Sequence, residues 1–463
     1  MKRLLLLLFI TQFTYSQESE SVLTFEEYLG YVQKFHPLVK QANLVISESQ
    51  ANLLKARGAF DPKMEIDFNR KTFKSDEYYD VISATFKVPT WYGIELKANF
   101  EESGGIYLNP QNTLPEDGLY SAGISFSVGQ GLLINNRMAA LKQAKYFVKQ
   151  QQSERIILVN EILYQASMAY FDWLKSYKEY MINEEFLANA ELRFKGVKQS
   201  IDSGDRAPID SIEAGITVYN RKLQIEQYRL ALKQKMLVAS NFLWLENNTP
   251  IEIQEDIIPD TSTKESVDFV LRITQDIPYD SNLTNHPKLL SLDYKLKQLQ
   301  VETRLKRNKL LPTINLEYNF LSQDPEIINS FNTLNYKSGL YFNMPLFLRK
   351  ERGDFKLAKL KLNNTEYERS NAKFTLSNKL KALESELYSL IEQEKYITKI
   401  VEDYQTLVNA EERKLELGDS SIFLINTREN SLIDAKLKAV SLQYKFLEVK
   451  AKLFNNLAIN PNS

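Results

Sequence analysis

The chain has 463 residues, 43% of them hydrophobic, and a formal net charge of −1, so it has no general electrostatic attraction to nucleic acid. It contains no cysteine, which excludes disulfide bonds, thiolate metal sites and lipid attachment through an N-terminal cysteine. With only 15 glycines and 14 prolines, the composition indicates an ordered chain.

Residues 1–16, MKRLLLLLFITQFTYS, have the pattern of a secretory signal peptide: two basic residues, an apolar run and a small or polar end before Gln17. The apolar run is too short to span a membrane as a helix. No later run approaches the roughly 18 apolar residues that a transmembrane helix needs. If the rest of the chain crosses a membrane, we therefore expect it to do so as β-strands.

The two histidines, in the dipeptides His36-Pro37 and His286-Pro287, mark an internal repeat. His286 lies 250 residues after His36, whereas Tyr336 lies 216 residues after its counterpart Tyr120. The chain therefore consists of two copies of one unit, and the first copy carries 34 extra residues. A proline suits the first turn of a helix, so we interpret the histidines as equivalent capping positions, not as metal ligands or an acid–base pair.

The first structured segments are two helices followed by strands. Thr24 and Glu27 form a capping-box pattern that predicts a short helix ending before His36, and a second helix is expected over 37–57. The period then changes to two. Apolar and polar side chains alternate over 63–69, 120–128, 313–320 and 336–344, which predicts strands with one apolar and one polar face.

The extra residues of the first copy contain two more alternating segments, 82–88 and 94–101. Each candidate strand has roughly the 9–11 residues that a tilted strand needs to cross a bilayer. The signal peptide and the aromatic residues near the strand ends favour a membrane protein over a soluble amphipathic sheet. Residues 78–101 either add two strands to this sheet or form an extracellular hairpin, and we favour the added strands.

Two long helices, 137–202 and 349–417, contain no proline, and each spans roughly 100 Å at about 1.5 Å per residue. Each is followed by a Gly-Asp turn and another helix, 208–245 or 422–458. The helix over 208–245 has two apolar stripes at heptad spacing, which predicts packing on both flanks, either in a curved wall of helices or inside a plain bundle. The stripes are Ile216, Leu223, Leu230 and Leu237, and Val218, Ile225, Leu232 and Ala239.

These patterns predict the domain organisation. Residues 1–16 are the signal peptide, and 17–245 are the first repeat, with a helix, strands over about 63–128 and a helical hairpin over 137–245. Residues 246–284 form a linker with a short strand and a short helix over 266–275. The second repeat, 285–458, has a helix, strands over about 313–345 and a hairpin over 349–458.

Several segments carry a family resemblance: LTFEEYLGYVQKFHPLVKQA over 23–42, KARGAFDPKMEI over 55–66, and the turn at Gly204 with Asp210 six residues later. With the repeated order of elements, the chain resembles the TolC-type outer-membrane efflux proteins, which usually have Asn-Pro where this sequence has His36-Pro37. The resemblance covers nearly the whole chain after the signal peptide. It implies an α+β membrane protein with two tandem repeats, in which a homotrimer forms a transmembrane β-barrel continued by a long α-helical barrel in the periplasm.

The resemblance also implies function and partners. It implies a passive exit duct in the outer membrane of a Gram-negative bacterium, gated at the periplasmic helix tips and serving a periplasmic adaptor protein and an inner-membrane transporter. No cofactor and no metal are expected, and no Gly-rich phosphate loop, His cluster or nucleophile motif indicates an enzyme. The alternative is a soluble periplasmic coiled-coil structural or adaptor protein.

By the same resemblance, residues six and nine after each tip glycine line the pore constriction. In the first copy these are Asp210 and Glu213, and three Asp210 carboxylates around a narrow axis would repel one another and attract cations. The second copy departs from the acidic pattern, with Leu424 at the first of these positions. Asp210 is also explained as a helix-capping residue. The turns Gly204-Asp205 and Gly418-Asp419 are expected to contact the adaptor, although glycine and aspartate are also common turn residues.

Overall fold

The structure is a computed structural model that describes residues 21–273, 283–324 and 332–459. The expected signal peptide lies outside these residues. The chain divides into two compact units. We call them the helical unit (Met1–Val39, Glu161–Gln275 and Ala382–Asn455) and the sheet unit (Lys40–Asn160, Asp276–Lys381 and Asn456–Ser463). Within the described ranges, no helix has an apolar stretch long enough to cross a membrane.

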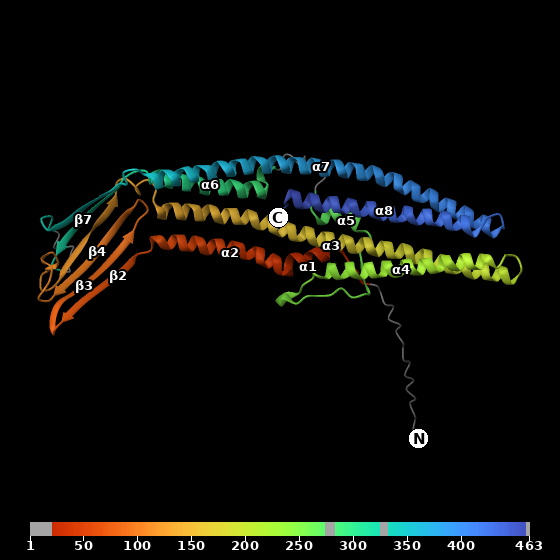
Figure 1. The fold of residues 1–463 in the computed structure, drawn as a ribbon, viewed down its shortest axis with the longest axis horizontal. Helices are drawn as coiled ribbons and strands as arrows, with labels where there is room; N and C mark the ends of the chain where they lie inside the picture. Colours follow the sequence, from red (N-terminus) through yellow and green to blue (C-terminus); the bar gives the residue numbers. More distant parts are fainter. Residues whose placement is uncertain (1–20, 274–282, 325–331, 460–463) are drawn as a thin grey trace, which may run out of the picture. The chain divides into compact units, whose positions relative to one another are not determined.

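The sheet unit contains one six-stranded sheet, in the order β2-β3-β4-β5-β7-β8, with every neighbouring pair antiparallel (Figure 1). All the predicted strands are present, and most are longer than expected. The 34 extra residues of the first copy supply most of β3 and β4, which pair with β2 and β5 inside the sheet and do not form a separate hairpin. The strands are Lys63–Phe73 (β2), Asp76–Pro89 (β3), Ile94–Gly104 (β4), Leu119–Ser127 (β5), Thr313–Ser322 (β7) and Tyr336–Asn343 (β8).

The sheet unit contains long segments of four helices: α2 (Pro37–Arg57), α3 (Asn136–Asp202), α6 (Pro287–Asn308) and α7 (Arg349–Glu416). They meet the sheet at one end (Figure 1). Polar side chains form contacts between these helices; for example, Ser291 on α6 donates a hydrogen bond of 2.9 Å to Glu154 on α3. Helices α3 and α7 contribute residues to both units.

The helical unit is built on an aromatic core. The capping box predicted at Thr24 is present at the start of α1 (Phe25–Phe35), and Phe25, Tyr28 and Tyr170 are each at most 1% exposed. The Tyr28 hydroxyl donates to the Ala239 carbonyl at 3.0 Å and the Tyr170 hydroxyl donates to the Leu23 carbonyl at 2.8 Å, so the buried phenols are satisfied. Helices α4 (Ile209–Ser240), α5 (Thr263–Val270) and α8 (Ile422–Leu457) complete this unit with parallel strands β1 (Ser21–Leu23) and β6 (Ile257–Pro259).

Two helices of the helical unit have bounds that differ from the predicted ones. Helix α4 ends at Ser240, not at 245, because a tight turn follows in which Trp244 pairs with Pro250 and Asn247 adopts a left-handed φ of 70°. The helix expected over 266–275 starts and ends earlier, as α5 (Thr263–Val270), and positions 274 and 275 lie outside the described residues. There Arg272, at a φ of 53°, takes the left-handed position that terminates a helix. Strand β1 was not predicted.

The two histidines have the structural role predicted for them. The Nδ1 atom of His36 accepts a hydrogen bond from the Leu38 amide at 3.2 Å, and that of His286 accepts one from the Lys288 amide at 3.1 Å. Both rings are at most 7% exposed, and burial lowers the pKa of each imidazole. An Nδ1 that accepts a hydrogen bond requires the neutral ring, so both histidines cap the helix that begins at the following proline.

Candidate functional site

The first candidate surface is the apolar face of the six-stranded sheet. Its register aligns apolar side chains from every strand, and these side chains are widely exposed: Met64 is 71% exposed, Ile66 59% and Leu340 70%. No helix of the described chain covers this face, and a patch that large is unusual on a water-soluble surface. One row across the sheet contains Met64, Phe86, Ala98, Ala122, Phe320 and Tyr336.

The opposite face of the sheet is polar. The next row contains Lys63, Lys87, Lys97, Gly123, Asn319 and Lys337. Carboxylates and amides lie among these cations, because Lys97 contacts Glu317 at 3.1 Å and Thr85 donates to Asn99 at 2.8 Å. Strict alternation therefore gives the sheet one face suited to lipid and one suited to water.

The second candidate surface is the pair of turns that end α3 and α7. The two turns have the same geometry: Gly204 has a φ of 83° and Gly418 a φ of 82°. After α3, the Asp205 amide donates to the Ser200 carbonyl at 2.9 Å. After α7, the Asp419 amide donates to the Lys414 carbonyl at 2.9 Å. Both turns are Schellman motifs, in which a left-handed glycine satisfies the last free carbonyls of a helix.

The residues predicted to line a constriction lie just beyond these turns. Asp210 is in the first turn of α4, with its side chain 30% exposed and 3.8 Å from Arg206. The backbone carbonyl of Glu213 accepts a hydrogen bond from Thr217 at 3.1 Å. Leu424, near the start of α8, is 43% exposed. Asp210 and Leu424 therefore occupy equivalent places after the two turns, one charged and one apolar.

Two contacts connect the paired hairpin ends. Arg206 donates to the Leu415 carbonyl at 3.2 Å, which joins the turn after α3 to the last residues of α7. Asn426 on α8 donates to Thr217 on α4 at 3.0 Å. A groove of about 650 Å³ lies beside them, lined by the ends of α3 and α7 and by both turn segments, with charged residues that include Arg193, Glu412 and Glu416.

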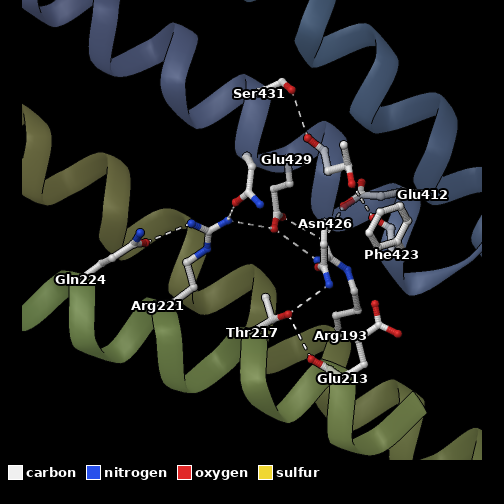
Figure 2. Close-up of polar contacts among 12 residues, drawn as sticks. Arg193, Glu213, Thr217, Arg221, Gln224, Glu412, Phe423, Asn426, Glu429 and Ser431 are labelled. Carbon is white, nitrogen blue, oxygen red and sulfur yellow. Dashed lines mark hydrogen bonds and ion pairs between the residues drawn. The ribbon is translucent and has the colours of Figure 1, made fainter. Parts of the chain in front are cut away.

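A buried charge cluster lies between the four helices of the hairpins (Figure 2). Its centre is Glu429 on α8, whose side chain is 1% exposed and accepts from Arg193 on α3 at 2.9 and 3.3 Å. Arg221 on α4 is 3.7 Å from the same carboxylate, and Glu412 on α7 is 3.4 Å from Arg193. We call Arg193, Arg221, Glu412 and Glu429 the four-helix clasp, because each of the four helices contributes one of these residues.

The clasp is incompletely satisfied at one point. Arg221 donates to Asn430 at 2.6 Å and to Gln224 at 3.0 Å, but its Nε atom is buried with no hydrogen-bond partner among the described residues. Burial lowers the pKa of the Arg221 guanidinium, and the Glu429 carboxylate acts in the opposite direction. A buried guanidinium of this kind depends on its carboxylate, because an unpaired charge is far more costly inside a protein than in water.

The clasp was not predicted from the sequence, although a signal for it exists there. Arg221 lies between Val218 and Ile225 in the apolar stripe of α4, and Glu429 lies between Ile425 and Leu432 in that of α8. A charged residue at a stripe position predicts a buried ion pair with a partner helix.

The two stripes predicted on α4 differ in burial. Val218 is 6% exposed and Ile225 5%, so the stripe that contains them packs within the chain. The other stripe is exposed, with Leu223 at 62% and Leu230 at 59%. The prediction that α4 packs on both flanks therefore holds for one flank within the chain.

Comparison with known proteins shows which sequences and solved structures are similar to this chain. Residues 279–457 match the outer membrane efflux protein family. No curated protein matches the sequence. Among solved structures, the chain is similar to the open-state MtrE outer membrane channel of Neisseria gonorrhoeae, with a TM-score of 0.67 and 13% identity over 94% of this chain and 88% of that one.

Two further solved structures have the same fold. The CmeC outer membrane channel of Campylobacter jejuni has a TM-score of 0.65 and 12% identity over 93% of this chain and 85% of that one. The outer membrane protein VceC of Vibrio cholerae has a TM-score of 0.64 and 10% identity over 93% and 95%. The chain thus has the fold of these outer-membrane proteins, and its residues 279–457 match the outer membrane efflux protein family.

Proposed function

We propose that the protein is an outer-membrane exit duct for efflux or secretion, which extends into the periplasm and is formed by three copies of the chain. The observation that carries the proposal is the six-stranded antiparallel sheet with one uncovered apolar face and one polar face. In lipid every backbone group needs a partner, so such a sheet is stable only when its edges are closed. Three chains close it into a β-barrel around a polar lumen.

The helices support the same assembly. The exposed stripe of α4 and the exposed apolar side chains of α7, which include Leu360 at 56%, Tyr367 at 74% and Phe374 at 69%, recur at seven-residue spacing. Heptad spacing is the pattern by which helices pack side by side. In a helical barrel, neighbouring subunits cover the exposed apolar side chains of both α4 and α7. The two halves of each chain then act as tandem repeats in the wall of this barrel.

The gate lies at the hairpin ends. Asp210 and Glu213 from each copy line its constriction in the first half of the chain, and Leu424 adds an apolar ring in the second half. The turns Gly204-Asp205 and Gly418-Asp419, with the groove between α3 and α7, bind the hairpin of a periplasmic adaptor protein. The adaptor couples the duct to an inner-membrane transporter, and the duct itself carries out passive transport without catalysis.

Planar-bilayer conductance of detergent-extracted protein tests this proposal. We expect discrete cation-selective channels, whose selectivity weakens in Asp210→Ala because each copy loses a carboxylate at the constriction. Asp202→Ala, which removes an exposed carboxylate just before the turn, is the matched control and leaves selectivity unchanged.

Two other outcomes are informative. Channels with the same selectivity in Asp210→Ala retain the duct and reject Asp210 as the constriction. A protein that stays in solution without detergent and forms no channels refutes the duct and favours a periplasmic rod.

A further inference from the structure

A pocket in the sheet unit lies where the sheet meets the helices. It has a volume of about 330 Å³ and is lined by the loop after β5, the start of α3 and the end of α6. Three cations line it, Lys142, Arg304 and Arg307, together with Asn308 and apolar side chains that include Leu133 and Leu311, and none of its lining residues carries a carboxylate. A cavity with this lining is suited to an anion.

The three cations differ from their basic neighbours in having no acidic partner. Arg137 contacts Glu95 at 2.6 Å, and Lys306 contacts Asp354 at 2.8 Å. Within the described ranges, no ion pair forms with Lys142, Arg304 or Arg307, and all three are exposed. Their positive charge is therefore available to a ligand. The two arginines lie in the last two turns of α6, where the helix dipole also favours positive charge.

The walls of the pocket are held by hydrogen bonds. Gln130 donates to the carbonyls of Lys309 at 3.0 Å and Leu311 at 2.6 Å, which fixes the loop after β5 against the end of α6. Asn308 donates to the Ile134 carbonyl at 2.9 Å and closes the same wall. The cations therefore lie beside a wall whose backbone is held in place by hydrogen bonds.

The rim of the pocket is apolar and exposed. Leu133 is 81% exposed and Leu311 46%. The Lys142 ammonium lies 5.7 Å from the centroid of the Trp91 ring, in the turn between β3 and β4 at this end of the sheet. Tryptophan at the end of a membrane strand marks the level of the lipid headgroups. A phosphate ester with attached alkyl chains satisfies both parts of the pocket, whereas inorganic phosphate satisfies only the cations.

We propose that this pocket binds the phosphate group of an anionic phospholipid in the inner leaflet of the outer membrane, with the acyl chains against Leu133 and Leu311. The inference rests on the proposed function, which places this end of the sheet at the headgroup level. The site would fix the depth of the sheet in the bilayer, because the cations are attached to helices that continue away from it.

The test measures binding of phosphatidylglycerol to the purified full-length protein in a non-ionic detergent by native mass spectrometry. Arg304→Gln with Arg307→Gln removes two pocket charges. The control, Lys359→Gln with Lys361→Gln, removes two exposed charges on α7 outside the pocket. Each cation near an anionic lipid contributes roughly 1 kcal/mol, so we expect the pocket variant to bind roughly 30-fold more weakly and the control to change less than about 2-fold.

The competing sources of phosphate are separated in the same assay. Excess glycerol 1-phosphate should not displace the lipid, and displacement at equal potency would assign the pocket to a free phosphate ester and overturn the lipid proposal. A wild-type protein that retains no phosphatidylglycerol, or a pocket variant that binds it as tightly as wild type, also overturns it. If the double variant does not fold, Lys142→Gln replaces it, because that side chain is exposed and forms no ion pair within the described residues.

Conductance of the same preparations separates this inference from the proposed function. Channels with lipid binding that is insensitive to the pocket variant refute the lipid site alone. Lipid binding that is lost in the variant of a protein that forms no channels refutes the duct alone.

Discussion

The turn after α3 and the turn after α7 have nearly the same backbone, with Gly204 at a φ of 83° and Gly418 at 82°, but different side chains follow them. Six residues later the first half has Asp210 and the second half has Leu424. The histidine caps of α2 and α6 show the same backbone equivalence. The comparison teaches that the two halves share the residues that direct the backbone and differ in the side chains that follow the turns.

The two halves also differ in the charged residues that they contribute to the four-helix clasp. Its arginines, Arg193 and Arg221, belong to the first half, and its carboxylates, Glu412 and Glu429, belong to the second half. Two identical halves would lack this ion pair, because the position equivalent to Glu429 in the first half, 214 residues earlier, is Gly215. The halves are therefore complementary here and equivalent at their turns.

The largest expected effect is on the free energy of unfolding, and it tests whether the charges of the two halves are complementary in the clasp. Glu429→Leu leaves Arg193 and Arg221 without their buried carboxylate, and loss of one partner of a buried ion pair lowers the free energy of unfolding by roughly 3–5 kcal/mol. Denaturant unfolding in detergent, followed by circular dichroism, measures the loss. Glu412→Gln is the control, since its side chain is 45% exposed and we expect a change below about 1 kcal/mol. Equal small losses in both variants would contradict a clasp centred on Glu429.

The next largest effect, on the melting temperature, tests whether the two glycine turns are equivalent. Gly204→Ala and Gly418→Ala each force a Cβ into the left-handed conformation, which costs roughly 1–2 kcal/mol. A Cβ at either glycine has no neighbouring atom within 4 Å, so strain of the backbone is the only expected contribution. The two variants should therefore lower the melting temperature by similar amounts. A much larger loss at one turn would show that the halves are not equivalent there.

The smallest effect concerns the histidine caps. Burial holds the pKa of His36 and His286 below the usual 6.5, so the unfolded chain takes up protons before the folded chain as the pH falls through that value. The unfolded state then binds more protons, and stability decreases as the pH drops below about 6.5. His286→Asn keeps an acceptor at the cap without titrating, so its melting temperature should fall less than that of wild type between about pH 7.5 and about pH 5. An unchanged pH profile would mean that this ring is not protonated more readily on unfolding.

Most elements of this fold could be predicted because their signals are local. The capping box at Thr24, the period-two strands and the glycine turns are each determined by residues within a few positions of one another. Strands β3 and β4, in the 34 extra residues of the first repeat, were predicted from the same local alternation. Strand β1 could not be found this way, because its three residues pair with β6 more than 200 positions away and carry no alternating pattern of their own.

The candidate site was predicted less completely for a related reason. The positions of Asp210 and Leu424 follow from their distance to a turn glycine, whereas the clasp depends on which helices pack together. Arg221 and Glu429 are far apart in the sequence, and each alone is one charged residue on a long helix. The exposed stripe of α4 was visible in the sequence, but its lack of a partner within the chain became evident only from burial.

The strand count of the sheet has a consequence for any closed assembly. Because six strands alternate in direction, the outermost strands β2 and β8 run opposite to each other. When copies stand around an axis, β8 of one copy lies antiparallel to β2 of the next, so every seam repeats the pairing found inside the chain. An odd number would force a parallel seam at each join. The first repeat carries two added strands and not one, so the strand number stays even and an antiparallel seam is preserved in any closed assembly.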